Sequence, residues 1–549
     1  MKTVFTNAIF HTMEDENDLC GTIVVENGRI VALDSPAGGR SPLNIDELAT
    51  KNTKVVDLHG AHAFPALIDS HMHMMEAIAF NAMTVEICHF ENGSVEPHTL
   101  TGAESIIRNH VANTKPDSLS VFANYFAATF DEGRLPTRFE LDDWGAGREI
   151  LVLNFDGHSS SCSTSLLKAV GLFGKVADNG ILRGPDHDAN IGTLTAHTVG
   201  SLTPAAIARG TAEFCNTCAS YGIGTICALE GTDDGPRDRA VEAFAHYAKR
   251  LPLDVRLFPQ YMDEERLSRV LPTMRTPRVG GCMKWELDGS VGSHTAAFET
   301  PYINGSQGSL YFETEKLEKT IRNLAERGFA VSAHAIGELA IEQLVGIYER
   351  LNEKDAIVTN PDAPGAARIK HRIDHCEFPS VSDRERINVL RPYITIQPGY
   401  SWIDKRYLHG YERLLSPEKI NQQIPLKDFA EAGIPMLGSS DAPVQTVDPY
   451  LQMRGMREFY LEDQSLSAFE ALKTYTVNGG AALGEAKGLL REGYEASFFT
   501  CDVDLIKCEP SELEGFHATS LWMHGKRYEP LPANISTLTR IAVTKPRLI

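Results

Sequence analysis

Two periodicities alternate along most of the chain. Short apolar runs typical of buried strands are followed by stretches with apolar residues at helical spacing, such as TEKLEKTIRNLAERG at 314–328. Repeated units of this kind indicate a parallel sheet, and eight of them predict an α/β fold, a TIM (β/α)8 barrel. The predicted strands lie near 63–69, 222–229, 254–261, 280–288, 328–334, 369–375, 392–397 and 434–441.

The interval between the first two predicted strands is too long for one crossover, so about 76–220 is predicted to be a large insertion with its own elements. Short alternating strands occur at both ends of the chain, including a hairpin at Asn27-Gly28. We expect residues 1–62 and 489–549 to form one composite β-sandwich. The barrel domain is then predicted to span 63–488.

Composition and charge exclude several classes of protein. With 42% hydrophobic and 23% charged residues the chain resembles an ordinary soluble globular protein. A formal net charge of -21 argues against nucleic-acid binding, which needs a basic surface. There is no signal-peptide pattern and no apolar run near the roughly 18 residues of a membrane span. We therefore expect a cytoplasmic protein with no nucleic-acid or membrane partner.

Several predicted strands end in residues that bind metals. In a TIM barrel the functional residues lie at the carboxyl ends of the strands. The first predicted strand ends in LIDSHMHM, and His71 and His73, two residues apart, are expected to point to the same side. Other predicted strands end at His334, His375 and Asp441. Imidazole nitrogen and carboxylate oxygen are the usual ligands of zinc and also suit iron or manganese, so these strand ends predict a metal site.

Each of these residues also has a structural interpretation. A single histidine at a strand end, such as His334, is more often a hydrogen-bonded core residue. Asp441 could open a turn before Pro443. Their occurrence together at the ends of successive predicted strands favours the metal site.

The fourth predicted strand carries Lys284, whose ammonium group has no lone pair for a metal. It would form an ion pair, or become a ligand after adding carbon dioxide to give a carbamate that bridges two ions. Asp288 and His158 are candidates for substrate binding or ligand support, weighed equally with turn and helix-start roles. His294 is a weaker candidate. Trp285 would contact an apolar substituent of the substrate or only the barrel wall.

Seven motifs, spread over nearly the whole chain, resemble the amidohydrolase superfamily, and within it the amidohydrolase-3 branch that includes N-substituted formamide deformylases. In order, they are FPALIDSHMHM, DGHSS, MKWELDGSVGSHTAAFETPY, VSAHAIGELA, HRIDHCEF, ITIQPGY and GSSDAPVQTVDPY. The resemblance implies one metal bound by His71, His73 and Asp441 and a second bound by His334 and His375.

The resemblance also implies that the bridging ligand is Lys284 carboxylated on its side-chain nitrogen, and it supports the composite sandwich. The sequence departs from the family pattern at several places, with Ala66 for a glycine, His294 for an arginine and Glu338 for an aspartate. None of these departures removes a predicted ligand.

These inferences predict a metal-dependent hydrolase that cleaves an amide, formamide or cyclic amide C–N bond of a small molecule, with Asp441 as general base. One or two divalent ions are expected, zinc first, with manganese or iron as alternatives. A homodimer is the expected assembly. Two alternatives stay open: the same metal site acting in ester hydrolysis, deamination or decarboxylation, and a non-catalytic regulatory protein on the same scaffold.

Overall fold

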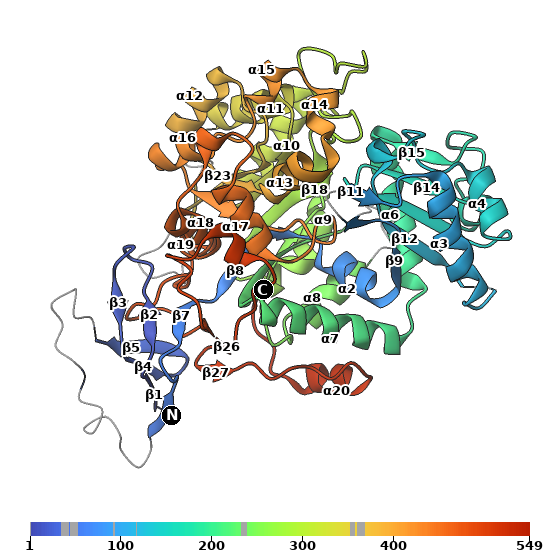
Figure 1. Cartoon of the computed structure of the whole chain (residues 1–549). Helices are drawn as coiled ribbons and strands as arrows, with labels where there is room; N and C mark the ends of the chain where they lie inside the picture. Colours follow the sequence, from blue (N-terminus) through green and yellow to red (C-terminus); the bar gives the residue numbers. More distant parts are fainter. Residues whose placement is uncertain are drawn as a thin grey trace.

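The centre of the molecule is made of parallel strands that follow one another in chain order (Figure 1). The computed structural model describes residues 2–34, 43, 53–91, 94–116, 118–231, 239–351, 357–359 and 368–549. The central strands are β8 (Leu67–Met72), β16 (Ile223–Glu230), β17 (Asp254–Pro259), β18 (Arg278–Glu286), β19 (Ala330–Ala335), β22 (Arg372–His375), β23 (Tyr393–Ile396) and β24 (Met436–Gly438). Each of the eight predicted strands overlaps one of them, and the predicted α/β class is confirmed.

The central strands form two arcs, ordered β17-β16-β8 and β18-β19-β22-β23-β24, with parallel pairing throughout. Backbone hydrogen bonds just past the strand ends bring the two arcs together. The N–H of Asp441 donates to the carbonyl of His71 at 2.9 Å, and the N–H of His73 donates to that of Ala442 at 2.8 Å. The first and last strands are therefore neighbours, as in a barrel. Because no ladder joins the arcs within the described residues, the closed cylinder stays a prediction.

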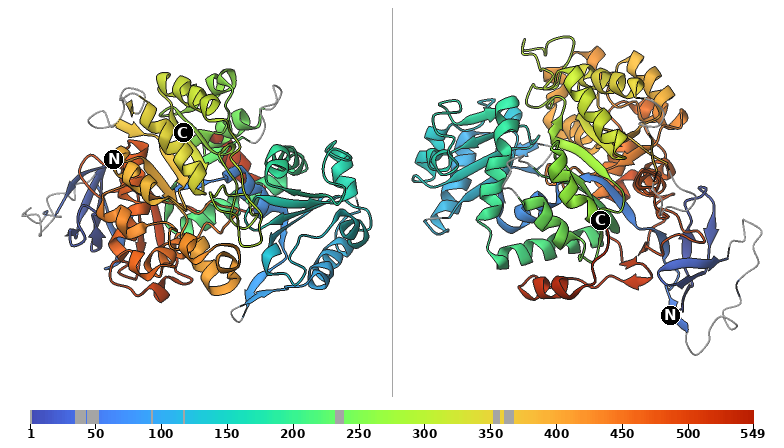
Figure 2. Two further views of the ribbon diagram at one scale, coloured as in Figure 1. Left: turned by 90° about the horizontal axis from the view of Figure 1, so that it is seen from above. Right: turned by 180° about the vertical axis from the view of Figure 1, so that it is seen from behind.

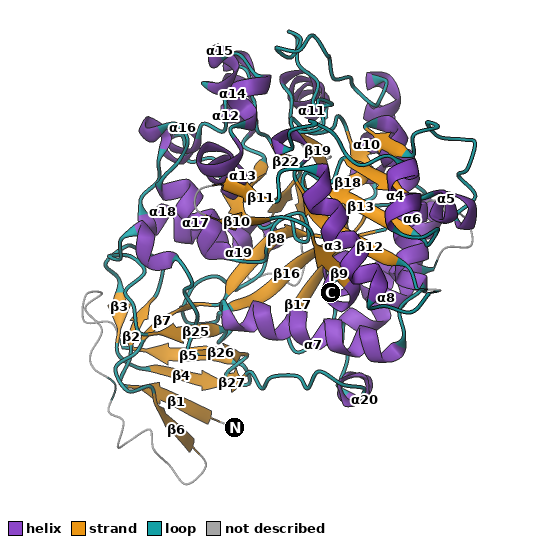
Figure 3. Cartoon of the chain, turned by 45° about the vertical axis from the view of Figure 1, so that its right-hand side comes forward, coloured by secondary structure: helices purple, strands orange, loops and turns teal. Residues whose placement is uncertain are grey.

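Helices cover the outer faces of these strands (Figure 3). In α10 (Thr314–Glu326) the helical spacing places Leu317, Ile321 and Leu324 on one buried face, while charged residues occupy the other. The other helices that accompany the strands are α2 (Met74–Met83), α7 (Pro204–Ser220), α8 (Ala240–Ala248), α9 (Glu264–Val270), α11 (Glu338–Arg350), α12 (Val381–Leu390), α16 (Leu426–Glu431), α17 (Pro449–Arg457), α18 (Ala468–Tyr475) and α19 (Val477–Leu483). No helix in the described ranges has the length and apolarity needed to cross a membrane.

The segment between β8 and β16 contains a sheet of its own, at the right of Figure 1. The strands are β9 (Thr84–Glu86), β12 (Ser120–Tyr125), β13 (Ile150–Asn154), β14 (Ser159–Cys162) and β15 (Ile181–Arg183), with helices α3 (Leu100–Ala112), α4 (Arg138–Trp144), α5 (Thr164–Ala169) and α6 (Pro185–Gly200). Their order is β15-β14-β13-β12-β9. Phe122, Trp144 and Ile150 belong to a separate hydrophobic cluster in this segment. It therefore has its own core beside the central strands.

The two ends of the chain share two further sheets. The strands involved are β1 (Lys2–Thr6), β2 (Ile9–His11), β3 (Leu19–Cys20), β4 (Ile23–Glu26), β5 (Arg29–Leu33), β6 (Thr53–Asp57), β7 (His62–Pro65), β25 (Phe498–Cys501), β26 (Ser520–Met523) and β27 (Lys526–Arg527). One sheet runs β5-β4-β1-β6 and the other β27-β26-β25-β7-β2-β3. Phe5 contacts Phe498 and Trp522 at ring-centroid distances of 5.1 and 4.8 Å, which packs residues from both ends into one core.

The predicted strand 63–69 is in fact two strands that meet at Ala66. The N–H of Ala66 donates to Ser497 of the terminal sheet at 3.0 Å, whereas the N–H of Leu67 donates to Gly222 beside the central strands at 2.9 Å. The chain thus passes directly from the terminal sheet into β8. The view from behind in Figure 2 shows the terminal sheets on one side of the central strands and the inserted sheet on the other.

Candidate metal centre

The ends of the central strands bring the predicted histidines and aspartate together. His71 Nε2 lies 3.1 Å from Asp441 Oδ1, and His73 Nε2 lies 3.4 Å from the same oxygen. The ring centroid of His375 is 5.0 Å from that of His71 and 4.5 Å from that of His334. All five side chains are buried. They form a cluster, called here the metal-ligand cluster, at the carboxyl ends of four different strands.

Left-handed backbone conformations end two of these strands. His375 has φ 69° and Asp441 has φ 58°. Such conformations are uncommon for residues other than glycine and cost about 1–2 kcal/mol each. They interrupt the extended strands at two of the predicted ligands, and strain of this kind is concentrated at functional sites.

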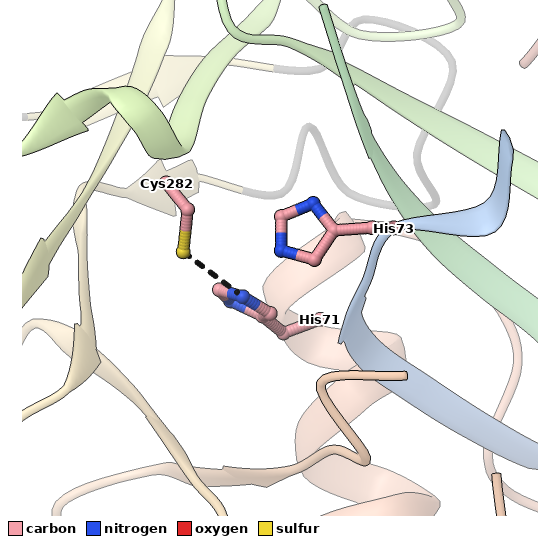
Figure 4. Close-up of side chains that lie close together, drawn as sticks. All are labelled: His71, His73 and Cys282. Atoms are coloured by element: carbon pink, nitrogen blue, oxygen red, sulfur yellow. Dashed lines mark hydrogen bonds between the residues drawn. The ribbon is translucent and has the colours of Figure 1, made fainter. Parts of the chain in front are cut away.

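Cys282 joins the cluster from β18, although it was not predicted to do so. Its sulfur lies 3.3 Å from His71 Nε2, 3.6 Å from His375 Nε2 and 3.8 Å from His334 Nδ1. Figure 4 shows the thiol directed at the ring of His71, with His73 beside it. The group that β18 contributes to the centre of the cluster is therefore a thiol.

The described contacts of the clustered histidines do not include Lys284, whose place among the ligands stays a prediction. Lys284 is only partly buried, and its Nζ makes no hydrogen bond or ion pair with the residues that the structure describes. In a regular strand, positions 282 and 284 would share one face. The pairing of β18 with β19 instead jumps from Gly281 opposite Ala333 to Glu286 opposite His334. This irregularity interrupts the regular alternation of side chains between Cys282 and Lys284.

Side chains stabilise the bulge by accepting its freed N–H groups. Gln260 Oε1 accepts from the N–H of Cys282 at 2.7 Å, and Glu286 Oε1 accepts from that of Met283 at 2.8 Å. The sequence signal for this irregularity was the glycine pair just before it. Gly280 has φ 103°, and a Cβ there would lie 1.8 Å from the carbonyl oxygen of Ser332.

Each histidine that faces Cys282 has a second polar contact behind it. Its other ring nitrogen is directed away from the cluster: His71 Nδ1 lies 3.5 Å from Asp374 Oδ2, His375 Nδ1 lies 2.9 Å from Gln397 Oε1, and His334 Nε2 lies 3.3 Å from the carbonyl of Gly289. Contacts of this type fix the tautomer and the ring orientation of metal-binding histidines. Asp374 and Gln397 were not predicted, although both lie inside the motifs HRIDHCEF and ITIQPGY.

The distances within the cluster fit a zinc-sized cation. For tetrahedral zinc, with Zn–S near 2.3 Å and Zn–N near 2.0–2.1 Å, ligand sulfur and nitrogen atoms lie about 3.6 Å apart and nitrogen and oxygen about 3.4 Å apart. The observed separations are 3.3–3.8 Å from Cys282 and 3.1–3.4 Å from Asp441. Asp441 Oδ1 is buried and accepts no hydrogen bond from the described residues. The donor set and its spacing therefore suit a divalent ion.

Electrostatics keeps the acidic members of the cluster ionised. Burial raises the pKa of Asp441, but the imidazoles of His71 and His73 outweigh it and hold that pKa well below its usual range. Burial likewise raises the pKa of the Cys282 thiol, and His71, His334 and His375 outweigh it and hold the pKa well below normal. The anionic side chains of Asp441 and Cys282 thus face the imidazoles of the cluster, and a divalent cation would balance their negative charge.

The structure separates the four predicted substrate-binding residues. His158 lies next to the cluster, with its ring centroid 5.3 Å from that of His334. Asp288 accepts backbone N–H groups from Ile336 and Gly337 and lies 3.6 Å from His334 Nε2, so it supports the cluster from behind. Trp285 is fully buried in the core, and His294 is partly buried beside Asn304. Neither residue lines one of the two cavities described next.

Two cavities meet at the cluster. A cavity of ≈ 120 Å³, called here the polar cavity because most of its lining residues are polar, is bordered by His334, His375 and Asp441 together with His158 and Tyr400. A mostly apolar cavity of ≈ 100 Å³ touches the cluster at His73 and is lined by Phe80, Val121, Leu151, Leu153, Ile191 and Val444. Phe155 lines both cavities. The metal-ligand cluster therefore lies between a polar compartment and an apolar one, and the apolar one is shared with the inserted sheet.

Known proteins are similar to this chain in sequence and in fold. An N-substituted formamide deformylase from Arthrobacter pascens is 22% identical to this chain, covering 95% of this chain and 97% of its own. The exoenzymes regulatory protein AepA from Pectobacterium carotovorum subsp. carotovorum is 21% identical, covering 63% and 76%. The crystal structure of a metal-dependent hydrolase from Pyrococcus horikoshii has the same fold, with a TM-score of 0.68 at 19% identity, covering 93% and 99%. The profile of the family described as "Amidohydrolase family" matches residues 54–528, most of the sequence, and the chain belongs to that family.

Proposed function

We propose that the protein is a metal-dependent hydrolase that cleaves the C–N bond of a small amide, formamide or cyclic amide at the metal-ligand cluster. The observation that carries the proposal is the convergence of His71, His73, His334, His375 and Asp441 at the strand ends. The proposal includes a closed (β/α)8 barrel, zinc as the first candidate metal, and one or two ions. A cytoplasmic location and a homodimer stay predictions.

The chemistry follows from the residues present. A divalent ion held by this cluster would lower the pKa of a water molecule and polarise the substrate carbonyl. Asp441 stays ionised because of its histidine neighbours, so it can accept the proton of that water and pass it to the leaving nitrogen. The hydroxyl of Tyr400 donates to Asp441 Oδ2 at 3.3 Å and holds the carboxylate in place.

His158 supplies a positive group to the polar cavity. Burial lowers its pKa, but Asp188, whose Oδ1 lies 3.7 Å from Nδ1, and Glu286 outweigh that effect and raise the pKa to about 10. A cationic imidazole at neutral pH favours a carbonyl oxygen or another electron-rich group of the substrate. We infer that the polar end of the substrate lies in this cavity.

The apolar cavity limits the class of substrate. Its lining offers Leu151, Leu153 and Val121 to a substituent that lies next to His73. A small amide with one apolar group and one polar group across the scissile bond fits both compartments. The similarity to an N-substituted formamide deformylase supports an amide-like substrate.

Metal content and turnover together test this proposal. Elemental analysis of the purified protein is expected to find a divalent metal, and removal by a chelator followed by addition of zinc or manganese is expected to abolish and restore hydrolysis of N-substituted amides. Full activity in rigorously metal-free protein would refute the proposal. If the metal is bound but only esters, amino-substituted rings or carboxylic acids react, the same site acts on a different bond.

A further inference from the structure

Cys282 is the one member of the metal-ligand cluster that the proposed function does not use. The ligand atoms of His71, His73 and Cys282 all lie within 4.8 Å of one another, and so do those of Cys282, His334 and His375. The same sulfur therefore belongs to both histidine pairs. A side chain shared in this way has the position of a bridge between two ions.

We propose that the Cys282 sulfur binds the metal as a thiolate and bridges the two ion positions, in place of a carboxylated Lys284. This inference rests on the proposed function, because it assigns one more ligand to the same site. It differs from the family expectation in the chemistry of the bridge, which is one sulfur atom instead of the two oxygens of a carbamate.

The ring orientations agree with this role. His71 and His375 direct Nε2 at the sulfur, and His334 directs Nδ1 at it, while their other nitrogens contact oxygen acceptors. The outer contacts favour a proton on the outer nitrogen of each ring and a lone pair on the inner nitrogen. Lone pairs on three nitrogens and one sulfur converge, and one thiol proton can satisfy only one of them.

The backbone also fixes Cys282 in this place. Its N–H is held by Gln260 at 2.7 Å, and the bulge that follows takes Lys284 out of the alternation with Cys282. The sulfur–nitrogen distances of 3.3, 3.6 and 3.8 Å bracket the separation of about 3.6 Å that two ligands of one tetrahedral zinc would have. A soft sulfur ligand is compatible with zinc and disfavours magnesium or calcium.

The test uses full-length protein stripped with a chelator and reloaded with zinc or with cobalt. X-ray absorption at the zinc edge of the wild-type protein is expected to show a sulfur neighbour at about 2.3 Å in addition to nitrogen and oxygen. The cobalt protein is expected to show a thiolate-to-metal charge-transfer band in the near ultraviolet. Both signals read the ligand directly and need no substrate.

Three variants locate the sulfur. Cys282→Ser is expected to lose the charge-transfer band, whereas Lys284→Ala and Cys227→Ser are expected to keep it. Cys227 is the matched control because it is a buried cysteine on the central strand β16 outside the cluster. The zinc measurement on the wild-type protein decides the question even if Cys282→Ser does not fold.

The outcomes distinguish the two proposals. A wild-type protein that takes up neither zinc nor cobalt would overturn the proposed function and this inference together. Bound zinc with only nitrogen and oxygen neighbours would leave the proposed function standing and overturn the cysteine bridge. Loss of the metal in Lys284→Ala, together with the mass of one added carbon dioxide on that lysine in the wild-type protein, would assign the bridge to Lys284.

Discussion

Replacing Asp374 by asparagine tests whether the contacts behind the histidines control the metal site. Asp374 is fully buried, and its Oδ2 lies 3.5 Å from His71 Nδ1 and accepts a hydrogen bond from Ser332. Its Oδ1 accepts from Arg372 at 2.8 Å and from Thr395 at 2.7 Å. With the Oδ1 side occupied by donors, the amide nitrogen of an asparagine would face His71. Nδ1 would then have to accept a hydrogen bond, which moves the ring proton to Nε2.

The expected effect follows from that change of tautomer. His71 Nε2 faces Asp441 and Cys282, so a proton there prevents it from binding an ion. Loss of a contact of this kind typically lowers metal affinity about 10–100-fold, or about 1.4–2.7 kcal/mol. The variant also leaves the buried Arg372 without its counter-charge, which is expected to lower the free energy of unfolding by about 3 kcal/mol.

Competition with a chromophoric chelator measures the zinc affinity, and urea unfolding measures the stability. Asp383→Asn is the matched control, because Asp383 is also buried and paired with an arginine, Arg386 at 3.3 Å, but lies on α12 and has no described hydrogen bond or ion pair with a residue of the cluster. The control is expected to lose stability and keep its zinc affinity. If folded Asp374→Asn binds zinc within threefold of the wild-type protein, the reasoning about the tautomer is wrong.

Three further predictions concern other residues. Asp441→Asn is expected to lower turnover of an identified substrate about 10²–10⁴-fold, the range for loss of a general base, and turnover near the wild-type rate would remove Asp441 from that role. Burial raises the pKa of Glu230 from 4.5 to about 8. In metal-free protein the free energy of unfolding is therefore expected to fall as the pH rises from 4.5 to about 8, because the unfolded chain ionises this carboxyl group before the folded protein does. At one pKa unit per about 1.4 kcal/mol, Glu230→Gln is expected to be more stable above pH 8 by at most about 5 kcal/mol, and unfolding curves that stay parallel across this pH range would contradict it. Gly280→Ala places a Cβ 1.8 Å from a carbonyl oxygen and is expected to lower the free energy of unfolding by about 2–4 kcal/mol. Its control is Gly60→Ala, at φ 80° with open space around it, which is expected to lower the free energy of unfolding by about 1 kcal/mol. Equal losses in the two variants would show that the structure relieves the clash at Gly280.

The central strands could be predicted from the sequence because burial on both faces leaves a continuous apolar run. The runs that became β16 and β17 are buried at every position, which is the pattern that a parallel strand under helices produces. The division of the run 63–69 at Ala66 could not be predicted, since both halves are equally buried and only their hydrogen-bond partners differ.

The convergence of these histidines could also be predicted, because strand direction alone places His71, His334 and His375 at one rim. Cys282 and Lys284 could not be distinguished in this way. Their positions depend on a bulge stabilised by Gln260, which belongs to a different strand connection, and a rule of alternation contains no such contact. The contact of Asp374 with His71 could not be predicted either, although Asp374 lies inside a recognised motif. Its role depends on Arg372 and on the position of the His71 ring, which only the structure gives.

The pairing of β7 with β25 connects the predicted metal site to the last part of the chain. Residues 62–65 pair with residues 498–501, and β7 continues through Ala66 into the strand that carries His71. During synthesis the first two histidines therefore leave the ribosome long before the segment that anchors their strand, and Asp441 also follows late. Contacts so distant in sequence form slowly. We therefore expect the proposed metal site to assemble late, because a shorter chain lacks strand β25, with which β7 pairs.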